Sequence, residues 1–169
     1  MQDVYIRGIS TVLPNAAITN DDMEAVLGQI GERPARERRI VLARNGIQSR
    51  YYAVDPDTRQ PTASNAALCA EAVRGLQGDA FTLPELDVLA CGTSSPDQIA
   101  PGHGVMVHGE LPEAGVCEAV SLAGICCAGM AALRYAALTV AGGQARHAVA
   151  TGSETASGFM RSEQFADQY

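Results

Sequence analysis

Two stretches of the chain are predicted to be apolar strands, Asp87–Thr93 and His147–Ser153. Asp87–Thr93 is continuously apolar, which is typical of a short strand buried on both faces of a sheet. Because such runs are a feature of parallel sheets that are covered on both sides, they predict a largely parallel sheet. Val116–Val120 is predicted to add a third short strand. Val4–Leu13, rich in β-branched and apolar residues and followed by a Pro-Asn pair, predicts a further strand and a turn.

Apolar residues at helical spacing predict helices between these strands. Thr62–Leu76 has one apolar face, and Cys127–Ala141 is a long Ala-rich run that is closed by Gly142. Shorter helices are predicted after an Asn20 cap as far as Gly28, at Arg33–Arg44 and at Gly102–Leu111. The alternation of strands and helices predicts an α/β fold, and the Ala-rich helices indicate closely packed layers. We find no linker and no internal repeat.

Composition excludes several classes of protein. Hydrophobic residues make up 47% and charged residues 18%, which argues against disorder, and no run is apolar enough to span a membrane. A net charge of −7 argues against general nucleic-acid binding. The five cysteines form no CxxC pair, so neither a disulfide framework nor a metal site is expected. With no basic, apolar leader at the start, we expect a cytoplasmic protein.

One segment is strongly basic within this acidic chain. Residues 33–50 hold six of the 12 arginines and one acid, Glu37, and the chain has no lysine. Two interpretations stand side by side. The cluster is a solvated helix face, or it is a rim that binds the phosphates of coenzyme A or of the phosphopantetheine arm of an acidic carrier protein. For Arg44 we favour the binding interpretation.

The chemistry is predicted to centre on Cys127, which follows a short strand and opens the Ala-rich helix. A thiol in the first turn of a helix meets unpaired N–H groups and the positive end of the helix dipole, and both favour the thiolate. The amides of Cys127, Ala128 and Gly129 can stabilise an oxyanion, and the small residues let an acyl chain approach. Core packing is the expectation for the other thiols, Cys69, Cys91, Cys117 and Cys126.

The segment Cys126–Met130, Cys-Cys-Ala-Gly-Met, resembles the Ala-Cys-Ala-Gly-Phe motif of the β-ketoacyl-acyl-carrier-protein synthase III family, in the thiolase superfamily. Other segments resemble the same family in the same order: Ile6–Pro14, Thr19–Met23, Arg44–Arg50, Gly92–Ser94 with Pro101, and Val149–Glu154. The resemblance implies a thiolase-like layered α/β fold, of which residues 1–169 are the N-terminal half-domain that carries the nucleophile.

The resemblance also implies an activity, a decarboxylative Claisen condensation in fatty-acid or secondary-metabolite synthesis. Cys127 takes an acyl group from an acyl-CoA or an acyl carrier protein, and a malonyl thioester then loses CO₂ and attacks it. The resemblance implies a homodimer and no cofactor. Arg44 matches an arginine near the pantetheine channel, and Ile99 and Ala100 match the acyl-pocket loop. Ala100 replaces a gating phenylalanine, which favours an acyl donor larger than acetyl-CoA or bound to a carrier.

The family's catalytic His and Asn lie in the second half of its fold, beyond residue 169. None of the histidines, His103, His108 and His147, matches the motif that holds the catalytic one, so we expect them to be structural or surface residues. A C-terminal half or a complementary chain is therefore expected to complete a condensing enzyme. Two alternatives remain open: an acyltransferase that does not condense, and a non-catalytic partner subunit in which Cys127 is a relic.

Overall fold

The computed structural model describes residues 2–29 and 36–168, which fall into two compact units. Unit 1 comprises Met1–Val12 and Ser64–Glu154. Unit 2 comprises Leu13–Ala63 and Thr155–Tyr169. None of the helices within the described ranges is both long enough and apolar enough to cross a membrane.

Unit 1 is built on a parallel sheet of three strands in the order β4-β3-β5. The central strand β3, Val88–Gly92, is buried along its whole length, as its apolar run predicts. β4, Glu118–Leu122, and β5, Ala148–Gly152, pair with it in parallel on either side. The predicted strands at 87–93 and 147–153 are thus confirmed. The one predicted at 116–120 begins two residues later, at Glu118.

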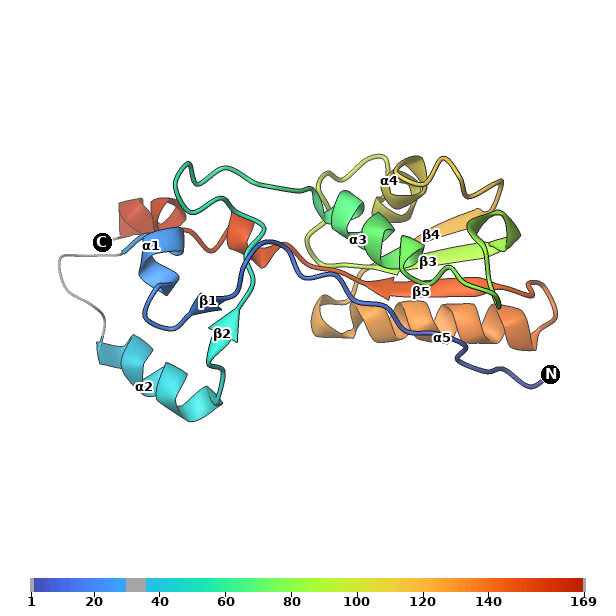
Figure 1. Cartoon of the computed structure of the whole chain (residues 1–169), viewed down its shortest axis with the longest axis horizontal. Helices are drawn as coiled ribbons and strands as arrows, with labels where there is room; N and C mark the ends of the chain where they lie inside the picture. The colour runs from blue at the N-terminus through green and yellow to red at the C-terminus, as the bar shows by residue number, and fades with distance from the viewer. Residues whose placement is uncertain (1, 30–35, 169) are drawn as a thin grey trace. The chain divides into compact units, whose positions relative to one another are not determined.

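Helices cover both faces of this sheet. Figure 1 shows α3 and α4 on one side and α5 on the other. These helices run from Asn65 to Arg74, from His103 to Gly109 and from Ala128 to Ala141. Because side chains alternate along a strand, Leu89 and Cys91 pack toward α3 and α4, whereas Ala90 packs against Ala132 and Ala136 of α5. The small alanine contacts bring α5 close to the sheet, as the Ala-rich pattern predicts.

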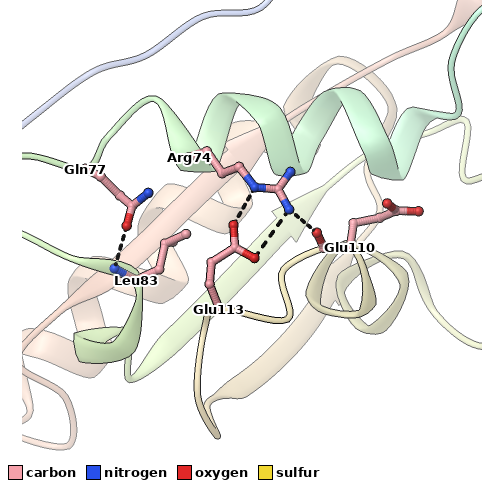
Figure 2. A network of polar contacts seen from close by, with 5 residues as sticks. All are labelled: Arg74, Gln77, Leu83, Glu110 and Glu113. Atoms are coloured by element: carbon pink, nitrogen blue, oxygen red, sulfur yellow. Dashed lines mark hydrogen bonds and ion pairs between the residues drawn. The ribbon is translucent and has the colours of Figure 1, made fainter.

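An ion pair joins the last turn of α3 to the segment that follows α4. Arg74 Nε lies 2.5 Å from Glu113 Oε1, and the same guanidinium donates to the backbone carbonyl of Glu110. Figure 2 shows this arginine reaching from α3 to the segment that follows α4. Nearby, the Leu83 N–H donates to the side-chain carbonyl of Gln77 over 3.4 Å. The hydrogen bond from Arg74 lowers the pKa of Glu113, and the pair is exposed, so its contribution to stability is small.

The predicted strand at Val4–Leu13 is wrong, because residues 2–14 contain no strand. The side chains of Tyr5, Ile6 and Ile9 are 73%, 70% and 85% exposed. β-propensity expresses how well a side chain fits a paired and half-buried strand, so it does not produce a strand without a neighbour to pair with. Among the described strands, none pairs with this segment.

In its described residues, unit 2 holds a two-residue antiparallel pair, β1 (Ile18–Thr19) with β2 (Ser49–Arg50), and the α-helices α1 and α2. α1, Met23–Leu27, ends at Gly28, where the backbone turns to a φ of 80°, as predicted. Its start differs from the prediction, since Asp22 precedes the helix instead of Asn20. The Asn20 side chain instead donates to the backbone carbonyl of Ile47 over 2.9 Å.

The basic helix of unit 2 is α2, Arg36–Asn45. It ends before Gly46, whose φ of 72° suits a glycine, as the Asn-Gly pair predicts. Its predicted start at Arg33 lies outside the described residues. The small core of this unit is formed by Val26, Tyr52 and Val54.

Candidate active site

Cys127 lies in the turn that joins β4 to α5, at the carboxyl edge of the parallel sheet. One 3-10 turn, Ile125–Cys127, leads into α5, and Cys127 occupies the position just before the first helical residue. Its side chain is exposed. Open α/β sheets bind ligands outside the carboxyl ends of their strands, so the thiol is placed where such a site would be. The predicted strand-to-helix junction is thus present, and the chemical role of Cys127 stays a prediction.

Glycines bring the start of α5 into direct contact with the neighbouring strands. A Cβ atom on Gly92, the last residue of β3, would lie 2.3 Å from the Ala128 carbonyl oxygen and 2.7 Å from the Gly129 nitrogen. A Cβ on Gly129 would lie 3.3 Å from the Cα of Gly152, the last residue of β5. A side chain does not fit at Gly92, and one at Gly129 would be tight. The position of Cys127 is therefore fixed by backbone contact with both strands.

The residue two before Cys127 has a strained backbone. Ile125 has a φ of 50°, which an L-residue with a branched Cβ rarely adopts. Its side chain is 75% exposed, so burial of the side chain does little to offset the cost. Residues in sparsely populated backbone regions tend to occur at functional sites, where surrounding contacts hold them in place. Here the contacts of α5 with β3 and β5 supply that constraint.

Replacing Ile125 with glycine is expected to keep or raise stability. The left-handed conformation costs an isoleucine about 1–2 kcal/mol, which a glycine does not pay. Glycine's greater freedom in the unfolded chain lowers stability by about 0.5–1 kcal/mol and so offsets part of this gain. Urea unfolding should therefore give Ile125→Gly a free energy of unfolding up to about 1 kcal/mol above wild type. The control is Ile99→Gly, also at an exposed isoleucine but without a positive φ, which should lose stability. Equal losses in the two variants would contradict the strain at Ile125.

The backbone amides next to Cys127 already have acceptors inside the turn. The Cys127 N–H donates to the Gly124 carbonyl over 3.0 Å, and the Ala128 N–H donates to the Ile125 carbonyl. An oxyanion would have to share these donors or displace the carbonyls. The oxyanion role expected of Cys127, Ala128 and Gly129 therefore stays a prediction. Cys127 itself stands at the positive end of α5, which has 14 residues.

The other cysteines divide by exposure. Cys69 and Cys91 are fully buried in the core between β3 and α3, as expected, and Cys117 is half-buried beside it. The neighbouring Cys69 thiol and burial raise the pKa of Cys91, which keeps that thiol protonated. The expectation that Cys126 packs in the core is wrong, because its side chain is exposed. The turn at Ile125–Cys127 lies at the surface, and none of its three residues is buried.

The loop at 94–101 leaves β3 at the same edge of the sheet. Its tip carries Ile99, which is 94% exposed, and Ala100, which is also exposed. The loop begins two residues after Gly92, the glycine that contacts the start of α5. The structure thus brings the predicted substrate-contacting loop and Cys127 to one edge of unit 1. No cluster of three or more His, Cys, Asp or Glu side chains suited to a metal ion occurs among the residues described.

The arginine cluster lies in unit 2, and its members differ in their contacts. Arg38 forms an ion pair with Glu24 at 2.9 Å, and Arg50 donates to the Met23 sulfur over 3.4 Å. These two side chains are half-buried and hold unit 2 together, which favours the structural interpretation for them. Arg44, in the last turn of α2, is exposed.

The histidines have structural contacts, as expected of them. His103 is buried, with Nε2 3.1 Å from the Ser153 hydroxyl. His108 Nε2 lies 3.0 Å from the Gly115 carbonyl. The ring of His147 lies 5.9 Å from that of Phe81, centroid to centroid.

Sequence reasoning missed a buried polar network at the carboxyl edge of the sheet. Asn65, Thr93 and His103 are buried polar residues there, and the Asn65 amide donates to the Thr93 hydroxyl over 2.9 Å. The only signal in the sequence was an asparagine at the start of an otherwise apolar helix face. Asparagine is common near helix starts, so that signal did not distinguish a buried network from an ordinary cap.

No protein-family model matches the chain. Curated proteins do match the chain. Two of those with the name "Beta-ketoacyl-[acyl-carrier-protein] synthase III" serve as examples. The one from Rhizobium johnstonii is 30% identical over 152 residues, and the one from Xanthomonas axonopodis pv. citri is 29% identical over 150 residues. Each match covers 89% of this chain and 42% of the relative, in its N-terminal half. The chain thus spans less than half the length of these relatives.

Solved structures with the same arrangement include condensing enzymes. A "tetronic acid condensing enzyme" superposes with a TM-score of 0.74 at 26% identity, covering 89% of this chain and 45% of that one. The synthase III of Thermus thermophilus has a TM-score of 0.68 at 25% identity, with 90% and 43% covered. The chain therefore has a thiolase-like α/β fold, as its sequence predicts. Its resemblance to the N-terminal half of β-ketoacyl-acyl-carrier-protein synthase III is confirmed.

Proposed function

We propose that this chain, a relative of β-ketoacyl-acyl-carrier-protein synthase III, supplies the acyl-accepting cysteine of a condensing enzyme. The observation that carries the proposal is the exposed Cys127 thiol at the start of α5 and at the carboxyl edge of the sheet. The names of the relatives support the reaction class. Exposure alone does not identify the nucleophile, since Cys126 is exposed too. Its place at the positive end of α5 distinguishes Cys127.

The proposed reaction has two steps. In the first, the Cys127 thiolate attacks the carbonyl carbon of an acyl thioester, a new C–S bond forms, and the carrier leaves as its thiolate and takes up a proton. In the second, a malonyl thioester loses CO₂, and its carbanion attacks the acyl-cysteine. A C–C bond forms, the bond to Cys127 sulfur breaks, and the thiolate is restored. The charge that develops on the carbonyl oxygen needs donors such as the α5 amides.

The second step needs groups that stabilise the enolate formed when the malonyl thioester loses CO₂. The three histidines of the chain are engaged in contacts within unit 1, and none matches the family's catalytic motif. We therefore assign the acyl transfer to Cys127 and the decarboxylation to a C-terminal half or a complementary chain. A homodimer is part of the same proposal.

The donor is proposed to be a coenzyme A or acyl-carrier-protein thioester. The exposed tip of the 94–101 loop carries Ile99 and Ala100 in place of a bulky aromatic side chain. Small or aliphatic residues leave more room beside an acyl chain than a phenylalanine does. We therefore expect donors longer than acetyl to be accepted.

Mass spectrometry tests the proposal in two stages. Incubation with octanoyl-CoA should add one octanoyl group to the protein, and peptide mapping should place it on Cys127. Addition of a malonyl thioester should then release a β-ketoacyl product and regenerate the free thiol. Acylation without a β-keto product would identify an acyltransferase that does not condense. The absence of acylation with any acyl-CoA or acyl carrier protein would contradict the proposed function.

Arg44→Ala is expected to weaken the use of anionic carriers. An exposed arginine acts on association with a charged partner through long-range attraction, which salt screens. At low ionic strength the KM for the acyl-CoA or acyl carrier protein should rise about two- to fivefold, and the difference should shrink in salt. Arg146→Ala removes another exposed arginine, from the loop before β5, and serves as the control. If Arg44→Ala leaves KM unchanged at low salt, the cluster is a solvated helix face.

A further inference from the structure

A single carboxylate holds the first two residues of the 94–101 loop. Glu154, just beyond β5, accepts the Ser94 N–H over 2.7 Å at Oε1 and the Ser95 hydroxyl at Oε2. Partial burial raises the pKa of Glu154, but the hydrogen bonds from Ser95 and Ser94 outweigh it and lower that pKa overall. The group is therefore ionised at neutral pH, the state in which both oxygens accept. Glu154 connects the chain after β5 to the chain after β3.

A buried asparagine fixes the same part of the loop from a third element. Asn65, at the start of α3, is fully buried, and its amide donates to the Ser95 carbonyl over 2.8 Å and to the Thr93 hydroxyl over 2.9 Å. The Thr93 hydroxyl also accepts the Ser95 N–H over 3.1 Å. In return, Asp97 of the loop accepts the backbone N–H of Asn65 over 2.7 Å. Residues 93–97 are thus tied to α3 and to the chain after β5.

Residues 93–97 form the stem of the loop, and its tip contrasts with them in exposure. Ile99 is almost wholly exposed, whereas an isoleucine normally gains stability by burial. A rigid stem that displays an exposed apolar side chain at the carboxyl edge of the sheet is suited to contact an apolar ligand. The stem begins next to Gly92, which contacts the start of α5 and so the turn that holds Cys127. The loop therefore leaves the sheet beside the start of α5.

We propose that Glu154 and Asn65 are positioning residues, which hold the 94–101 loop and through it select the acyl chains that reach Cys127. The selection of acyl chains rests on the proposed function, because it needs Cys127 to be acylated. The positioning of the loop does not. The two parts are therefore tested separately.

Hydrogen–deuterium exchange tests the positioning. Glu154→Gln keeps the size of the side chain but removes the charge and one of the two acceptor oxygens, so peptides covering 94–101 should exchange at least threefold faster. Asp87→Asn is the control, because the Asp87 carboxylate also accepts two hydrogen bonds, in its case from the backbone N–H groups of Arg146 and His147, at 2.8 and 3.0 Å. It lies at the opposite end of β3, so it should speed exchange at 146–147 and leave 94–101 unchanged. Wild-type exchange of 94–101 in Glu154→Gln would overturn the proposal.

Relative acylation rates test the selection. The ratio of the rate with octanoyl-CoA to the rate with acetyl-CoA should move toward 1 by at least threefold in Glu154→Gln, because a loosened loop discriminates less. Asp87→Asn should keep the wild-type ratio. An unchanged ratio in Glu154→Gln, or an equal change in Asp87→Asn, would overturn the selective role. If wild type itself is not acylated by either donor, the proposed function fails and the selective role with it, while the exchange experiment still decides the positioning.

Discussion

Cys127→Ala is expected to abolish acylation of the protein, with a loss on the order of 10³-fold or more in the rate of acyl transfer. The reason is that acyl transfer through a covalent intermediate needs a nucleophile, and alanine offers none. Fold and stability should change little, since the Cys127 side chain is exposed and its sulfur caps no helix amide. Intact-mass measurement after incubation with acyl-CoA gives the acylated fraction, and circular dichroism checks the fold.

The neighbouring thiol supplies a control for this prediction. Cys126 and Cys127 are both exposed, but only Cys127 immediately precedes the first residue of α5. Cys126→Ala should therefore retain acylation. In wild type, iodoacetamide at pH 7 should label Cys127 about tenfold faster than Cys126, because Cys127 stands at the positive end of the α5 dipole. Faster labelling of Cys126, or acylation that survives in Cys127→Ala, would remove the assignment of the nucleophile.

Gly92→Ala is expected to destabilise unit 1 strongly. The added Cβ would lie 2.3 Å from the carbonyl oxygen of Ala128 and 2.7 Å from the nitrogen of Gly129. Both are backbone atoms, so no side-chain rotation can relieve the overlap, and the start of α5 must move away from β3. Overpacking of this kind costs about 1–3 kcal/mol, and occasionally more. Urea unfolding should show this loss, and any folded fraction should label more slowly at Cys127.

Gly109→Ala is the matched control for Gly92→Ala. Gly109 is the last residue of α4, and a Cβ placed on it meets no atom within 4 Å. In a helix, alanine is favoured over glycine by about 0.5–1 kcal/mol, so this variant should be at least as stable as wild type. The two Gly→Ala changes are thus predicted to have opposite signs. Equal stability of Gly92→Ala and wild type would contradict the close contact between β3 and α5.

Elements with a strong local signal could be predicted from the sequence. The apolar run of β3 and the Ala-rich pattern of α5 fix those elements, because burial on both faces and tight helix packing each require a recognisable composition. Gly28 and Gly46 mark the ends of α1 and α2 because both adopt a positive φ. The place of Cys127 at a strand-to-helix junction followed from the same local signals.

Features that depend on a partner distant in the sequence could not be predicted. Val4–Leu13 has the composition of a strand, but strand formation requires a neighbour, and the sequence does not say whether one is in reach. Cys126 looked like a core thiol because cysteine is commonly buried, yet the turn that carries it lies at the surface. Asn20 has the residue type of a cap, but Ile47 is its partner.

The sequence by itself determined the α/β class, the central strand, the long helix and the cysteine that opens it, because each depends on residues adjacent along the chain. Only the tertiary structure decided how the site is held. Glu154 meets Ser94 across 60 residues, and Asn65 meets Thr93 across 28. Gly92 is a glycine because the backbone of Ala128 lies against it. Such contacts depend on how strands and helices pack in space, and a linear pattern of apolar and polar residues does not record them.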